Sequence, residues 1–124
     1  MTRPTGVILS ALLISTPVAM PAWAHHGWGG QEEQVTSLTG TVVQGVSLAG
    51  PHATMKIKVG NDVWDLTLAP PARTESAGLK EGLIPIGATV TVRGNRNLDH
   101  ARHEMKTIYI KQGTAEYHVY AERE

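Results

Sequence analysis

Apolar and polar residues alternate along most of the chain beyond residue 34, and this period of two is typical of strands that bury one face. Residues 53–59 show the pattern most clearly, because Ala, Met, Ile and Val alternate there with Thr and Lys. The turn-forming residues Gly-Asn-Asp follow at 60–62. The alternation predicts six strands, which cover residues 36–48, 53–59, 63–68, 88–93, 106–111 and 115–120.

Residues 70–86 depart from this alternation. Two prolines at the start of the stretch end the third strand, and residues 72–79 can then form two helical turns. We expect Gly82 and Pro85 to end that helix. The stretch therefore predicts one short helix between the third and fourth strands.

The first predicted strand is long and contains Gly40 and Gly45. Glycine inside a long strand commonly marks a bulge or a sharp bend. A bent first strand and a helix between strands three and four are typical of a small OB-type barrel, whereas an ordinary β-sandwich is expected to lack that helix. We therefore predict an all-β fold over residues 35–124, a small OB-like barrel of five to six antiparallel strands with one short helix between strands three and four.

Residues 1–24 have the three parts of a secretory signal peptide. Arg3 provides a positive charge, residues 7–14 form an apolar run, and residues 22–24 read A-x-A, the pattern of a cleavage site. The apolar run is much shorter than the roughly 20 residues of a membrane-spanning helix. We expect cleavage after this motif, which makes the protein periplasmic or secreted, leaves no transmembrane segment and makes His25 the first mature residue.

The composition restricts the function further. The chain of 124 residues has 11 basic and 11 acidic side chains, which argues against a nucleic-acid binder that works through bulk positive charge. It contains no cysteine, so disulfides, thiolate metal ligands and thiol nucleophiles are excluded. No serine lies in a G-x-S-x-G motif, and neither H-E-x-x-H nor a phosphate-binding glycine loop occurs. We therefore expect one domain and favour a binding role without catalysis, with a metal-dependent oxidase or hydrolase as the remaining alternative.

Short motifs occur in a specific order along the chain: A-H-H-x-W at 24–28, L-x-G-x-V at 38–42, P-H at 51–52 and V-x-V-x-G at 90–94. Together they resemble a family of short exported bacterial proteins, the domain of unknown function 6152. The resemblance continues to residues 117–120 and so covers the whole expected mature chain. It implies export and the β-barrel architecture. It implies no chemistry, because that family has no established activity.

The histidines provide the candidate chemistry. After cleavage, the α-amine and imidazole of His25 can chelate a metal ion together, and a third nitrogen from His26 or His52 completes a set suited to Cu(II). Such an amine titrates near about 7.7–8.0 and an imidazole near about 6.5, so both can act as neutral ligands around neutral pH. Residues 25–34 are rich in glycine and predict a flexible arm that spans up to about 33 Å. The alternative is that His25 and His26 merely follow the cleavage site and that His52 bonds the backbone of its own turn.

A second histidine cluster lies between the fourth and fifth predicted strands. His100 and His103 are three residues apart, with Asp99 and Glu104 on either side as oxygen donors for Zn(II) or Ni(II). The two imidazoles share a side only if the loop forms a helical turn, and Arg102 would repel a cation. We therefore favour a solvated polar loop.

The alternative function needs no metal. Lys56, Lys58 and Arg93 lie on alternating positions that can line one strand face, and Trp64 offers a ring for stacking in a barrel groove. This arrangement predicts an envelope interaction module that binds a glycan or a polypeptide. The competing interpretation places Trp64 in the core and the three basic residues on a solvated face.

Overall fold

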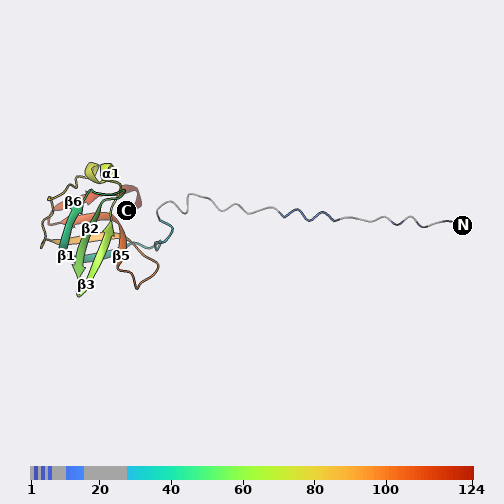
Figure 1. Ribbon diagram of the computed structural model, residues 1–124, viewed down its shortest axis with the longest axis horizontal. Coiled ribbons are helices and arrows are strands. Elements are labelled where there is room, and N and C mark those ends of the chain that lie inside the picture. The colour runs from blue at the N-terminus through green and yellow to red at the C-terminus, as the bar shows by residue number, and fades with distance from the viewer. Residues whose placement is uncertain (1, 3, 5, 7–10, 16–27) are drawn as a thin grey trace.

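All six predicted strands are present in the computed structural model, which describes residues 2, 4, 6, 11–15 and 28–124 (Figure 1). They are β1 (Thr36–Ser47), β2 (Thr54–Val59), β3 (Asp62–Thr67), β4 (Thr89–Arg96), β5 (Glu104–Gln112) and β6 (Ala115–His118). Within the described residues, two short helices accompany the strands, namely α1 (Pro71–Ser76) and the 3-10 helix η2 (Ala121–Arg123). The expected cleavage site lies outside the described residues. In the part of the chain that is described, no helix has the length and apolar character needed to cross a membrane.

The strands form one sheet in the order β3-β2-β1-β4-β5-β6, and an additional pairing of β3 with β5 closes five of them into a barrel. The prediction of a small all-β barrel with a helix between strands three and four is confirmed. The prediction of purely antiparallel pairing is wrong at one place, because β3 and β5 pair in parallel. The reason is geometric: strand directions cannot alternate all the way around a closed ring of five strands, so one pair must be parallel.

The glycines of β1 shape the barrel in two ways. β1 pairs with β4 through its first half and with β2 through its second half. Its pairing with β2 is irregular on both sides of Gln44, next to Gly45, in agreement with the predicted bend. At Gly40, a Cβ atom would lie 2.5 Å from the carbonyl oxygen of Lys58. Glycine at this position therefore allows β1 and β2 to approach closely.

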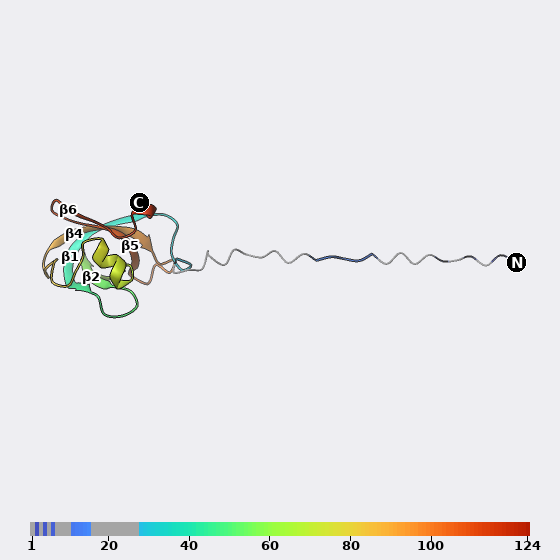
Figure 2. The same ribbon diagram turned by 90° about the horizontal axis from the view of Figure 1, so that it is seen from above.

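Helix α1 covers one end of the barrel (Figures 1 and 2). It is shorter than predicted, because the chain leaves the helix at Gly78 and not near Gly82. Gly78 has a φ of 97°, and its N–H donates to the carbonyl of Glu75 at 2.9 Å. The next N–H, of Leu79, donates to the carbonyl of Thr74 at 3.2 Å. These two bonds satisfy the last carbonyls of the helix, and glycine tolerates the left-handed conformation that they require.

Apolar side chains from all five barrel strands fill the interior. Examples that are 1% exposed or less are Val42, Met55, Leu66, Val92 and Met105. Buried and exposed residues alternate most regularly in β2 and β3, as predicted, whereas residues 105–110 of β5 are all buried. The core thus supplies the stability of a domain that contains no disulfide.

The described part of the predicted arm, residues 28–34, is attached to the barrel beyond the end of β4. The N–H of Glu32 donates to the carbonyl of Arg96 at 2.9 Å. The N–H of Leu98 donates to the carbonyl of Gly30 at 3.0 Å. Through these bonds, the arm pairs antiparallel with the segment that follows β4 and lies against the barrel wall.

Candidate functional site

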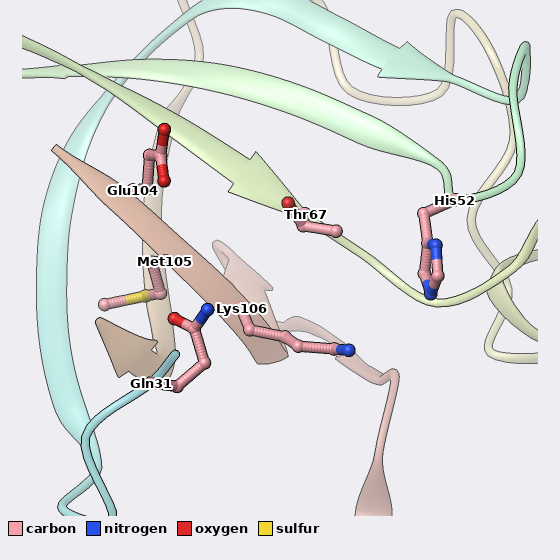
Figure 3. Close-up of a pocket in the computed structure, with 6 residues that line it drawn as sticks. All are labelled: Gln31, His52, Thr67, Glu104, Met105 and Lys106. Atoms are coloured by element: carbon pink, nitrogen blue, oxygen red, sulfur yellow. The ribbon is translucent and has the colours of Figure 1, made fainter. Parts of the chain in front are cut away.

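His52 lines a pocket of about 250 Å³ on the side of the barrel (Figure 3). His52 belongs to the loop between β1 and β2, and the other contributing segments are the arm, the end of β3 and the start of β5. The lining residues are Gln31, His52, Thr67, Glu104, Met105 and Lys106. The pocket therefore forms where the arm and this loop meet the parallel pair that closes the barrel.

The parallel pairing sets which side chains of the pocket are neighbours. Thr67 is the register partner of Lys106. Register partners present their side chains on the same face of a sheet, so Thr67 and Lys106 are neighbours on one face of this pair. In Figure 3, the Lys106 ammonium, Thr67 and the His52 imidazole lie toward one end of the pocket, and the Glu104 carboxylate lies toward the other. One end is thus rich in hydrogen-bond donors.

Lys106 is unusual because it is a lysine that is only 7% exposed. Its Nζ lies 4.5 Å from the centroid of the Trp28 ring, a distance that allows a cation–π interaction. Burial lowers the pKa of Lys106, and the nearby guanidinium of Arg123 lowers it further. The ammonium group that borders the pocket is therefore poorly hydrated and has another cation close by.

Trp28 connects the arm to β5 and to the C-terminal segment. The guanidinium carbon of Arg123 lies 3.7 Å from the Trp28 ring centroid. The ring of Tyr120 meets Trp28 edge-on at a centroid distance of 5.2 Å, and Arg73 lies over the Tyr120 ring at 4.4 Å. Burial is the main cause that raises the pKa of Tyr120. This aromatic and cationic cluster holds the arm beside the pocket.

The three predicted copper ligands fall in different parts of the chain. His52 lies in the pocket, whereas His25 and His26 lie outside the described residues. Across residues 2, 4, 6, 11–15 and 28–124, no three His, Cys, Asp or Glu side chains lie together in a way that could hold a metal ion. The arm nevertheless lines the pocket at Gln31, five residues after His26.

The histidines of the second cluster pair with different carboxylates. His100 pairs through Nε2 with Glu32 of the arm. The Nε2 of His103 lies 3.9 Å from Asp62, and its ring lies 5.1 Å from that of Trp64. The loop that carries them is joined to the arm on one side and to β3 on the other.

The predicted groove residues lie on two faces of the barrel wall. Lys56 and Lys58 are exposed on the outer face of β2, and Lys56 pairs with Asp65 at 3.3 Å. Arg93 lies over the Tyr109 ring at 4.1 Å. Trp64 is only 6% exposed and belongs to the core. The structure thus does not bring the Trp64 ring onto the face that carries the two lysines.

Three of the pocket residues were not predicted from the sequence, namely Gln31, Thr67 and Lys106. Their residue types are common, and alternation does not reveal which strands pair to close a barrel. One signal was available: Lys106 interrupts an otherwise mostly apolar stretch at 105–110, and a lysine there is expected to have a specific partner or role.

Comparison with known proteins supports the resemblance seen in the motifs. The model of a family of unknown function matches residues 12–106, well over half of the chain. The match includes every residue that lines the pocket and ends within β5. No curated protein matches the chain in sequence. The chain therefore belongs to the family of unknown function DUF6152.

Proposed function

We propose that the protein is an exported, periplasmic binding protein without catalytic activity, and that it binds Cu(II). The α-amine and imidazole of His25, made available by removal of the signal peptide, provide two nitrogens, and His26 or His52 provides the third. One observation supports this proposal most directly. The arm that carries His25 and His26 lines, at Gln31, the same pocket as His52.

The position of Trp28 supports the reach of the arm. Trp28 contacts Lys106, which itself borders the pocket that contains His52. His26 precedes Trp28 by two residues, which span at most about 7 Å of extended chain. A metal held by the first mature residues therefore lies within a short chain length of the pocket.

When His52 is the third ligand, the positive charge of Lys106 disfavours metal binding, because its ammonium group borders the same pocket. The lowered pKa of Lys106 reduces this electrostatic repulsion, since less free energy is needed to remove the proton from its ammonium group. With His26 as the third ligand, the proposed site needs no residue of the pocket that Lys106 borders. The choice between the two histidines is therefore open to a direct test.

The test is a Cu(II) titration of the mature protein in phosphate-free buffer, followed by electron paramagnetic resonance. Acetylation of the mature N-terminus removes the amine of the six-membered amine–imidazole chelate and is expected to weaken binding by about tenfold or more. Unchanged affinity of the acetylated protein overturns the N-terminal site. Comparison of His26→Gln with His52→Gln identifies the third nitrogen, and His118→Gln on the exposed face of β6 is the matched control.

An envelope interaction module that binds a glycan or polypeptide is the weaker alternative. Its predicted groove combines Trp64 with Lys56 and Lys58, and these side chains lie on opposite faces of the barrel wall. Binding of such a ligand to metal-free protein, with His25 and His26 dispensable, would favour this alternative over the copper site.

A further inference from the structure

Strand β6 is a free edge of the sheet. It stands last in the strand order, and no strand in the described part of the chain pairs with its outer side. It follows β5 through a two-residue turn and pairs with that strand without a bulge. Sheet edges are commonly protected by proline, lysine or a bulge, and β6 has none of these. Because β6 also lies at the periphery of the domain (Figure 2), its edge is open to another strand.

The hairpin geometry determines which backbone groups of β6 face outward. The register partners that flank the turn form a hydrogen-bonded pair, so bonds to β5 recur at every second residue of β6. The N–H of Val119 fits this series, since it donates to the carbonyl of Ile108 at 2.9 Å. Tyr117 therefore also bonds β5, whereas the N–H and C=O groups of Glu116 and His118 point away from the sheet.

The side chains of Glu116 and His118 are exposed on the outer face of β6. Glu116 accepts a hydrogen bond from the Tyr109 hydroxyl through Oε1, and this bond lowers the pKa of the Glu116 carboxyl. His118 bonds Glu124 through Nδ1. Within residues 28–124, Oε2 of Glu116 and Nε2 of His118 have no hydrogen bond. Each side chain therefore has one polar atom left for a partner.

We propose that the protein forms a two-fold symmetric dimer in which β6 of one copy pairs antiparallel with β6 of a second copy. An axis through Tyr117 places Glu116 of each copy opposite His118 of the other, so the outward N–H and C=O groups of both residues bond across the axis. The opposing side chains share one face, where carboxylate and imidazolium attract each other. An axis through Glu116 or His118 would instead place identical charged groups opposite each other.

A hollow at the end of α1 supports a second copy as the occupant of this edge. Tyr117 packs against the core on the inner face of β6, where a Cβ atom at Gly78 would lie 3.6 Å from its ring. Gly78 also lines the hollow, which has a volume of about 380 Å³ and is bordered further by Glu75, Leu79 and Lys80. In the dimer, the tyrosine of the second copy lies beside Tyr117 on this face and can extend over the hollow. Glu75 and Lys80 then offer partners for its hydroxyl.

Sedimentation velocity of the metal-free protein over a series of concentrations tests the dimer. His118 donates from both ring nitrogens only when it is protonated, so the measurement is made at about pH 6. We expect a dissociation constant of about 10–100 µM, because short strands form a small interface. Hydrogen exchange should show the N–H groups of Glu116 and His118 becoming protected as the concentration rises, with no change at Tyr117, which bonds β5. A protein that stays monomeric up to about 1 mM overturns the proposal, as does dimerisation without this protection.

Two charge-changing variants test the register of the pairing. Glu116→Lys puts a second cation opposite His118, and His118→Glu puts two carboxylates opposite each other, so each variant alone should dimerise about tenfold more weakly or worse. A mixture of the two variants restores opposite charges at both contacts and should form a mixed dimer. Lys58→Glu, on the outer face of β2, is the matched control and should dimerise like the unmodified protein.

Circular dichroism establishes that both variants are folded before they are mixed. If two folded variants form no mixed dimer, the pairing of Glu116 with His118 is wrong. The exchange measurement on the unmodified protein decides the proposal even if one variant does not fold. The dimer includes no residue that is proposed to bind copper, so neither result bears on the copper site.

Discussion

Thr67 and Lys106 are register partners in the parallel pair that closes the barrel, and both side chains line the pocket beside His52. The pairing that completes the fold is therefore also the one that assembles the candidate site. Substitutions near this pair are expected to affect stability and the pocket together, whereas substitutions elsewhere on the wall are expected to leave the pocket intact.

Gly94→Ala tests the close approach of β4 and β5 behind Lys106. A Cβ atom at Gly94 would lie 2.2 Å from the carbonyl oxygen of Lys106 and 2.8 Å from Cγ of Met105. The backbone must move to accept it, so we expect the free energy of unfolding to fall by about 2–3 kcal/mol. Urea denaturation measures this change. Gly45→Ala is the control, because its Cβ would lie at 3.4 Å from the nearest atom. Equal urea midpoints for Gly94→Ala and the unmodified protein would contradict the close packing.

Trp28→Ala tests whether the aromatic and cationic cluster holds the arm. Removal of the indole eliminates its contacts with Lys106, Arg123 and Tyr120. We expect a loss of about 2 kcal/mol in the free energy of unfolding, because a large aromatic contact surface is lost. Hydrogen exchange at the N–H of Glu32, which bonds the barrel, should accelerate.

The comparison for this variant is Val63→Ala, at a side chain that is exposed on β3. It should change the free energy of unfolding by about 0.5 kcal/mol or less and leave exchange in the arm unaltered. If Trp28→Ala leaves the exchange rate at Glu32 unchanged, the indole does not hold the arm in place.

The alternation of apolar and polar residues was sufficient to predict the six strands. β2 shows this most directly, because Met55 and Ile57 are buried while Lys56 and Lys58 are exposed. β5 departs from the pattern, since its residues 105–110 are all buried.

The helix was predicted from the prolines before it, but its end was not. Gly78 and Gly82 both have the left-handed conformation that commonly follows a helix, and the bonds made by Gly78 and Leu79 determine which one ends it.

The pocket could not be predicted in the same way, because it depends on contacts between distant segments. Strict alternation places Lys106 on the same face as Ile108 and Ile110, but the pairing of β5 with β4 is irregular between Thr107 and Tyr109, and Lys106 lines the pocket instead. It is buried because Trp28 of the arm covers it. The glycines around Trp28 suggested flexibility, and the backbone bonds that fix Glu32 and Gly30 involve groups that every residue has. Two pocket residues were singled out from the sequence, namely His52 and Glu104, and Glu104 was assigned to a different cluster.

Tyr109→Phe tests a hydrogen bond on the outer wall between β5 and β6. The Tyr109 hydroxyl donates to Glu116 at 2.6 Å, and this bond is the main cause that lowers the pKa of Glu116 below its usual 4.5. A carboxyl group with a lowered pKa in the folded state stabilises the fold above its unfolded pKa, and this contribution is lost as the pH falls through the folded value. We expect Tyr109→Phe to be less stable at neutral pH and the difference to shrink on acidification below 4.5.

Urea unfolding at a series of pH values measures this difference, with Tyr117→Phe on β6 as the matched control. A stability difference between Tyr109→Phe and the unmodified protein that stays constant from neutral to acidic pH would show that the hydroxyl does not act through the ionised Glu116.

Lys106→Met tests the desolvated ammonium beside the pocket. Burial and then Arg123 lower the pKa of Lys106 from its usual 10.5, so the folded state binds fewer protons than the unfolded state between the two pKa values. The contribution of this lysine to stability therefore rises with pH across that interval. Methionine preserves an unbranched chain against Trp28 and does not titrate. We expect the variant to lack this rise, so the unmodified protein gains stability relative to it between neutral pH and about 10.5.

The comparison of pH profiles isolates Lys106 from the other groups that titrate in this range. Tyr109 and Tyr120 have raised pKa values, so their contribution is lost above about 10, but they are present in both proteins and cancel in the difference. Lys58→Met changes an exposed lysine and should follow the profile of the unmodified protein. If the profile of Lys106→Met also follows it, the ammonium is hydrated in the folded protein.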